Sequence, residues 1–138
     1  MEDRYLFKAK DCNSIWRTGL LIGLQEGRCA IEEKDGSKWA CNSKTICQCT
    51  GLKDKNGKLI WENDVVKCVD VNAETEFFAV VEFGNPNGFY SWGYQLKHIY
   101  GDEPNLDILL WIDMEETGAT CAVFGNIFDN PELLESEG

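Results

Sequence analysis

The sequence predicts a mainly β protein built around a small barrel. Short apolar runs recur about every 8 to 12 residues, and turn residues separate them, as in barrels and sandwiches. The chain has 138 residues, of which 43% are hydrophobic, and this is enough for one compact core. We therefore expect one compact unit with a strand-rich N-terminal part at 1–49 and a barrel part at 50–138.

The N-terminal part is predicted to consist of strands joined by hairpins. The alternating stretch at 4–10 predicts a first strand. The longer run at 15–24 predicts a second strand, in which Gly19 and Gly23 mark bends or bulges. Two shorter strands are expected in C-A-I-E and S-K-W-A-C, because a Gly-containing turn precedes each of them.

The second half is predicted to contain further strands and to end in a short helix. The runs at 65–71 and 76–83 are rich in β-branched and aromatic residues, which favour strands. The run at 107–113 could form a helix or a strand, and the E-E-T-G turn with the strand-like A-T-C-A-V-F-G after it favours a hairpin. Near the end, Asn130 as an N-cap and Pro131 at the first helical position predict a helix start.

Charge is distributed unevenly along the chain. The net charge is −11, yet residues 1–69 carry a balance of +2 and residues 70–138 a balance of −13. Such a division is typical of a solvated acidic surface or of an acidic face that contacts a partner. The side chains expected to form this face are Asp102, Glu103, Asp107, Asp113, Glu115 and Glu116.

The cysteines indicate a reducing compartment. The chain has seven of them, and its start, M-E-D-R-Y-L-F-K, lacks the apolar segment of a secretion signal. Reduced thiols in a cytoplasm are therefore expected. No run approaches the roughly 20 apolar residues that a transmembrane helix needs, so no membrane partner is expected.

Four residues are candidates for metal or thiol chemistry. Cys41, Cys47 and Cys49 could bind zinc with His98 as a fourth ligand, but their C-x5-C-x-C spacing differs from that of structural zinc knuckles. Buried thiols that act as small hydrophobic side chains are the favoured interpretation. His98 is the only histidine and lies in an alternating stretch, which favours a structural role over a catalytic pair with a cysteine. We expect no cofactor.

Residues 50–67 combine two turn signals with a large aromatic side chain. The Asn-Gly pair at 56–57 is a strong hairpin signal, and Asn63 can adopt a positive φ in a second tight turn. Trp61 lies between the two turns and is predicted to pack inside the protein.

Two segments carry a resemblance to a known family. Residues 50–67 read T-G-L-K-D-K-N-G-K-L-I-W-E-N-D-V-V-K, and residues 124–135 read F-G-N-I-F-D-N-P-E-L-L-E. Both resemble signatures of the YopX family of small bacteriophage and prophage proteins, although Asn63 replaces the usual glycine and the acidic stretch 102–116 lies outside the pattern. The resemblance implies a predominantly β fold and a mobile-element origin. It implies no established activity.

A nucleic-acid-binding barrel is the alternative. The stretch I-W-E-N-D-V-V-K also resembles the loop-to-strand entry of small SH3-like barrels, some of which bind nucleic acid. The groove would be formed by Lys53, Lys55, Lys58, Trp61, Trp92 and Tyr94. However, a net charge of −11 opposes binding to phosphates.

The favoured hypothesis is a non-enzymatic accessory phage protein that acts through protein–protein contacts. It would either self-associate as a homo-oligomer or bind a host protein through its acidic face. A thiol- or metal-dependent enzyme is a second, weaker alternative.

Overall fold

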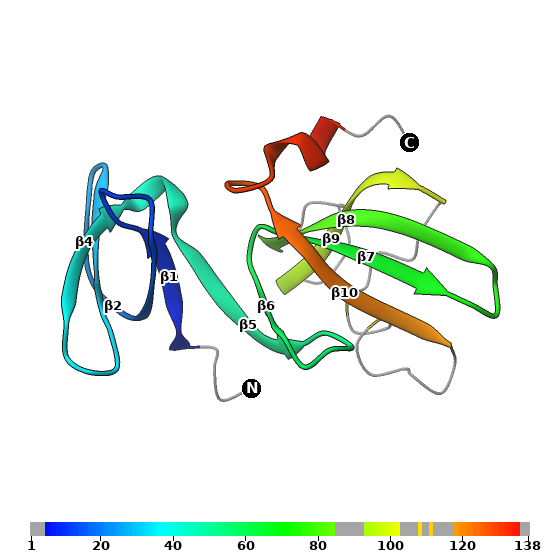
Figure 1. Ribbon diagram of the computed structural model, residues 1–138, viewed down its shortest axis with the longest axis horizontal. Helices are drawn as coiled ribbons and strands as arrows, with labels where there is room; N and C mark the ends of the chain where they lie inside the picture. Colours follow the sequence, from blue (N-terminus) through cyan, green and yellow to red (C-terminus); the bar gives the residue numbers. More distant parts are fainter. Residues whose placement is uncertain (1–4, 85–92, 103–107, 109–110, 112–117, 136–138) are drawn as a thin grey trace. The chain divides into compact units, whose positions relative to one another are not determined.

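The computed structural model describes residues 5–84, 93–102, 108, 111 and 118–135. The chain divides into two compact units, residues 1–51 and 52–138, and antiparallel strands make up most of the described residues of each (Figure 1). The predicted mainly β class is therefore confirmed.

Ten strands are described. In chain order they are β1 (Phe7–Lys10), β2 (Trp16–Gln25), β3 (Arg28–Glu32), β4 (Lys38–Asn42), β5 (Cys47–Lys53), β6 (Leu59–Trp61), β7 (Asp64–Asp70), β8 (Thr75–Gly84), β9 (Gly93–Gly101) and β10 (Ala119–Asn126). Two short 3-10 helices accompany them, η2 (Ser43–Thr45) and η4 (Pro131–Glu135). One sheet has the order β4-β3-β2-β1-β5-β6 and the other the order β10-β7-β8-β9.

The predicted closed barrel is wrong, because the described strands form two sheets and no closed barrel. An isolated bridge joins Asp11 to Cys41, but it does not extend into a ladder. Turn signals specify which neighbouring strands pair as hairpins. Closure depends in addition on the tilt and stagger of all the strands together, and the turn residues do not encode these.

The predicted short C-terminal helix is also wrong, because Pro131–Glu135 forms only a 3-10 turn of five residues. Its Leu133 N–H donates to the Asn130 carbonyl at 3.0 Å, three residues back. A segment of five residues forms too few hydrogen bonds to offset the nucleation of an α-helix. The hairpin predicted at 107–113 falls mostly outside the described residues.

The first unit has a small apolar core. Its buried cluster consists of Ala9, Cys29, Ile31 and Cys41. Gly19 lies where β2 and β3 approach closely, and a Cβ there would collide with the Glu32 carbonyl. The β2–β3 register shifts between Leu21 and Gly23, so the bulge predicted at Gly23 is confirmed.

The second unit has a larger and more aromatic core. The Phe77 ring meets the Trp111 ring edge-on at 5.2 Å, and both side chains are buried. The other members of this buried cluster are Ile60, Val66, Cys68, Ala79, Val81, Leu96, Ile108, Ala119 and Cys121. In the part of the chain that the structure describes, no helix has both the length and the apolar character for crossing a membrane.

Candidate binding site

The buried carboxylate of Asp54 ties the first signature segment to β10. Its Oδ1 accepts the backbone N–H groups of Asn56 and Lys58 at 2.9 Å each. Its Oδ2 accepts the Val123 N–H of β10 at 2.8 Å. Burial by itself would raise the pKa of Asp54, but the three backbone donors outweigh it, and the pKa lies below the usual value. One side chain thus holds the turn and anchors it to the sheet.

The second turn of the same segment joins the two signature segments. The Asp64 carboxylate accepts the Trp61 N–H at 2.8 Å, which closes the turn. Asn63 has a φ of 73°, as its position in the pattern predicted. Its N–H donates to the Val81 carbonyl at 2.7 Å, and its carbonyl accepts the Ile127 N–H at 3.1 Å. Asn63 is therefore fixed between β8 and the second signature segment.

The second signature segment forms a turn held by two asparagines. The Asn126 Oδ1 accepts the N–H groups of Phe128 and Asp129 at 2.9 Å each. The Asn130 N–H donates to the Asn126 carbonyl at 2.9 Å. A Cβ at Gly125 would lie 2.5 Å from the Asn130 Oδ1, so a larger residue there would displace the Asn130 side chain. The signature residues of both segments therefore act by fixing backbone.

A pocket of about 320 Å³ lies on this unit, and residues from both signature segments line it. Asn63 comes from the first segment, whereas Ile127 and Leu134 come from the second. Strands β8 and β9 supply the rest of the wall. The apolar lining is Val80, Ile99, Ile127 and Leu134, and the polar lining is Asn63, Glu82, Lys97 and His98.

The charged groups of the pocket are partly exposed. Lys97 is the one basic residue after position 69, and its Nζ lies 3.9 Å from the Glu82 carboxylate. The side chains are 60% and 35% exposed, so this pair contributes little to stability. The His98 Nε2 lies 3.3 Å from the Gly101 carbonyl. The charged groups of the pocket can therefore be reached from solvent.

Aromatic rings continue the surface next to the pocket. Phe78 lies two residues before Val80 on β8, so both side chains point to the same face. The Phe78 ring stacks on Tyr100 of β9 at 4.7 Å and meets Phe124 of β10 edge-on at 5.2 Å. Phe124 is 56% exposed. We call Phe78, Tyr100 and Phe124 the aromatic cluster.

The predicted acidic face falls mostly outside the described residues. Glu103, Asp107, Asp113, Glu115 and Glu116 belong to those outside. Asp102 is described, and its carboxylate accepts the Glu76 N–H at 2.9 Å. The Asp102 N–H in turn donates to the Glu76 carbonyl at 2.9 Å. Asp102 therefore fixes backbone and also contributes negative charge at an exposed position.

The residues of the predicted nucleic-acid groove have different environments. Lys53, Lys55 and Lys58 are exposed. Trp61 is only 9% exposed, in agreement with its predicted interior position. Tyr94 is half-buried, with its ring 5.0 Å from that of Phe83, and Trp92 lies outside the described residues. Trp61 is thus not available on the surface for stacking on a base.

The cysteines are all free thiols, and six of the seven are buried. Burial, then the neighbouring Cys29 and Asp11, raise the pKa of Cys41 to about 11. A thiol with so high a pKa stays protonated at neutral pH and is a poor nucleophile. The described residues contain no cluster of three or more potential metal ligands.

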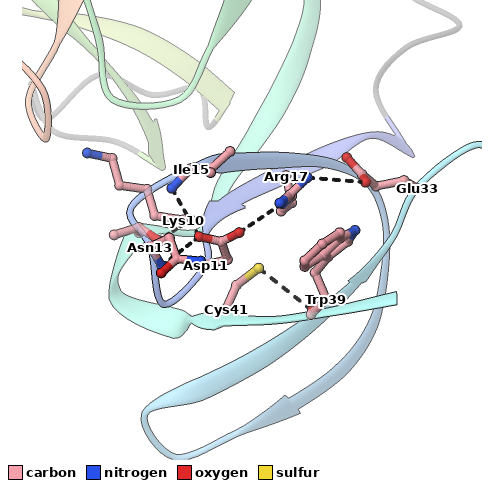
Figure 2. Close-up of polar contacts among 9 residues, drawn as sticks. Lys10, Asp11, Asn13, Ile15, Arg17, Glu33, Trp39 and Cys41 are labelled. Atoms are coloured by element: carbon pink, nitrogen blue, oxygen red, sulfur yellow. Dashed lines mark hydrogen bonds and ion pairs between the residues drawn. The ribbon is translucent and has the colours of Figure 1, made fainter. Parts of the chain in front are cut away.

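A polar network in the first unit was missed by the sequence analysis (Figure 2). The Arg17 Nε lies 2.9 Å from the Asp11 Oδ2, and its Nη1 lies 3.8 Å from the Glu33 carboxylate. The guanidinium carbon lies 3.4 Å from the centre of the Trp39 ring. The pKa of Asp11 is lowered mainly by the hydrogen bond from the Ile15 N–H. Burial raises the pKa, and the contact with Arg17 lowers it further. No local spacing connects these positions in the sequence.

The first unit also exposes an apolar row on β2. Leu20, Ile22 and Leu24 occupy alternate positions and are 45%, 47% and 64% exposed. We call these three side chains the β2 row. Exposed apolar groups gathered in one place are typical of contact surfaces.

The described residues define a small all-β protein in which residues of both signature segments line a pocket. The family model described as YopX protein matches residues 6–135, nearly the whole chain. The chain therefore belongs to the YopX family, as the resemblance of its two segments predicted. No curated protein matches the sequence.

Proposed function

We propose that this protein is a non-enzymatic accessory phage protein that acts through protein–protein contacts. The observation that carries this proposal is the apolar pocket beside the aromatic cluster. Residues 52–138, which contain both, have 5 basic and 17 acidic residues, a balance of −12. Protein interfaces combine aromatic anchors with charged surroundings in this way. The negative balance supports a protein partner over a nucleic acid.

A catalytic role has less support. Nucleophilic cysteines need a lowered pKa, whereas burial raises the pKa of Cys29 and, with its neighbours, that of Cys41. The contacts of His98 are structural in character, since its Nε2 faces the Gly101 carbonyl and its ring lies 6.1 Å from the Phe77 ring. The free thiols also support the host bacterial cytoplasm as the place of action.

The test is capture of host proteins on the immobilised full chain at low and high ionic strength. We expect a salt-sensitive partner that binds the natural protein and is lost from the Phe124→Ser variant. Val71→Ser is the matched control, because Val71 is 66% exposed in the same unit but outside the pocket and the aromatic cluster. Absence of any salt-sensitive partner would end the proposal.

Self-association is a second candidate, which the β2 row favours. Residues 1–51 carry 8 basic and 7 acidic residues, a balance of +1 against −12 for the second unit. Unlike charges would attract one copy to another at low salt. Light scattering should then show oligomers at low ionic strength, and Leu24→Ser should reduce them. A monomer at low and high ionic strength would exclude this candidate.

A further inference from the structure

We propose that the pocket of the second unit binds one aliphatic side chain of a lysine- or arginine-rich segment of a partner protein. This inference rests on the proposed function, for which it names the docking site and the chemistry of the partner.

The pocket has the size and lining for an aliphatic side chain. Its volume of about 320 Å³ is at the low end of the roughly 300 to 1,000 Å³ of ligand pockets, so it suits a small group. Val80 is 6% exposed, which places it deep in the lining, whereas Leu134 is 47% exposed and lies nearer the solvent. Ile99 and Ile127 are half-buried between these extremes. A leucine or isoleucine side chain would cover exposed parts of these walls.

The pocket is held in shape by backbone hydrogen bonds. Asn63 is fixed to Val81 on one side and to Ile127 on the other, at 2.7 and 3.1 Å. The turn held by Asn126 and Asn130 connects Ile127 to η4, which carries Leu134. A preformed pocket loses little conformational entropy when a side chain enters it. This favours an anchor site over a surface that would have to rearrange.

The negative charge of the second unit favours a basic partner. Exposed carboxylates of this unit include Glu74, Glu76, Asp102, Asp129 and Glu132. Its two described lysines on β7 and β9 are already near carboxylates, Lys67 at 3.6 Å from Glu76 and Lys97 at 3.9 Å from Glu82. A partner cation can therefore compete with Lys97 for Glu82 at the pocket. The balance of −12 on the unit would also speed the encounter with a basic segment.

The test uses a labelled peptide with the sequence Lys-Lys-Leu-Lys-Lys and a matched peptide in which serine replaces the leucine. Fluorescence anisotropy is measured on the full chain at low and high ionic strength. We expect the leucine peptide to bind about tenfold more tightly, since burial of a leucine side chain favours binding by that order. Equal affinity for the two peptides would overturn the proposal, because it would mean attraction by charge alone.

Two variants locate the site. Leu134→Ser should remove most of the preference for leucine, whereas the control Val71→Ser should retain it. Glu82→Gln should lower the affinity for both peptides and reduce the salt dependence of binding. Glu74→Gln, outside the pocket, should change the affinity and the salt dependence less. Thermal unfolding of each variant checks that it is folded. A leucine preference that Leu134→Ser leaves intact would contradict this site.

The remaining outcomes separate this inference from the proposed function. One outcome is that the peptide does not bind, the protein forms oligomers and Leu134→Ser abolishes them. This would mean that the pocket binds a second copy of the chain and not a basic segment. Binding of a host partner could be lost in the Phe124→Ser variant but retained in the Leu134→Ser variant. This would contradict the pocket as the anchor site and leave the proposed function in place. If neither the leucine peptide nor a host protein binds the chain, both proposals are wrong.

Discussion

The two units of this protein rely on different interactions. The first has a buried cluster of four small or medium-sized side chains and adds a network of Asp11, Arg17, Glu33 and Trp39. The second has a larger cluster with Phe77, Leu96 and Trp111, and uses buried carboxylates mainly to hold turns. A unit with little apolar surface to bury depends more on polar contacts. Loss of a core aromatic side chain should therefore destabilise the second unit most, and loss of the polar network should destabilise the first unit.

The largest effect should come from the core of the second unit. Phe77 is 1% exposed and contacts Trp111, so Phe77→Ala would leave a cavity and destabilise the protein by about 4 kcal/mol. Chemical denaturation followed by tryptophan fluorescence would measure this loss. Phe83→Ala is the control, because Phe83 is 53% exposed. A similar loss in both variants would contradict the assignment of the core.

The next effect should come from Asp54. Asp54→Ala would leave three backbone N–H groups without their acceptor and cost about 2 to 3 kcal/mol. Amide hydrogen exchange should show faster exchange at Asn56, Lys58 and Val123. The control Asp35→Ala removes a carboxylate that accepts the Ser37 N–H in an exposed turn of the first unit. Unchanged exchange at Val123 in the Asp54 variant would show that the turn does not depend on this carboxylate.

A smaller effect is expected for the network of the first unit. Arg17→Met keeps much of the aliphatic stem but removes the cation beside Asp11 and above the Trp39 ring. We expect a lower Tm and faster exchange in β1 and β2, with the second unit unaffected. Arg28→Met is the control, because Arg28 is exposed. Equal exchange in both variants would mean that the network contributes no stability.

The smallest effect is the response to acid. The pKa values of Asp11 and Asp54 are lowered in the folded protein, so each group contributes stability above its unfolded pKa of about 4, and this is lost as pH falls through the folded value. Stability should therefore be level near neutral pH and decline below about pH 4. Asp54→Asn should flatten part of that decline. An equal decline with and without Asp54 would contradict its lowered pKa.

The sequence predicted local features well because the turn residues act locally. Asn63 adopts the positive φ that its position in the pattern required, and Trp61 is buried as expected. Gly23 lies at the bulge that its place within a strand suggested. Each of these predictions depends on a few neighbouring residues and on the conformations that they allow.

Features made by distant residues could not be predicted in this way. The pocket takes Asn63, Glu82, Lys97 and Ile127 from four separate parts of the chain, which only the pairing of strands brings together. The network around Arg17 likewise depends on strand register. Barrel closure was predicted wrongly for the same reason, since it depends on the arrangement of all the strands.

The most direct test of the account is a titration of the isotope-labelled full chain with the Lys-Lys-Leu-Lys-Lys peptide, followed by NMR. We expect the largest chemical-shift changes at the amides of Glu82, Lys97, His98 and Ile127, and much smaller changes with the serine peptide. Shifts centred on the β2 row, or equal shifts with both peptides, would contradict an aliphatic anchor site in this pocket.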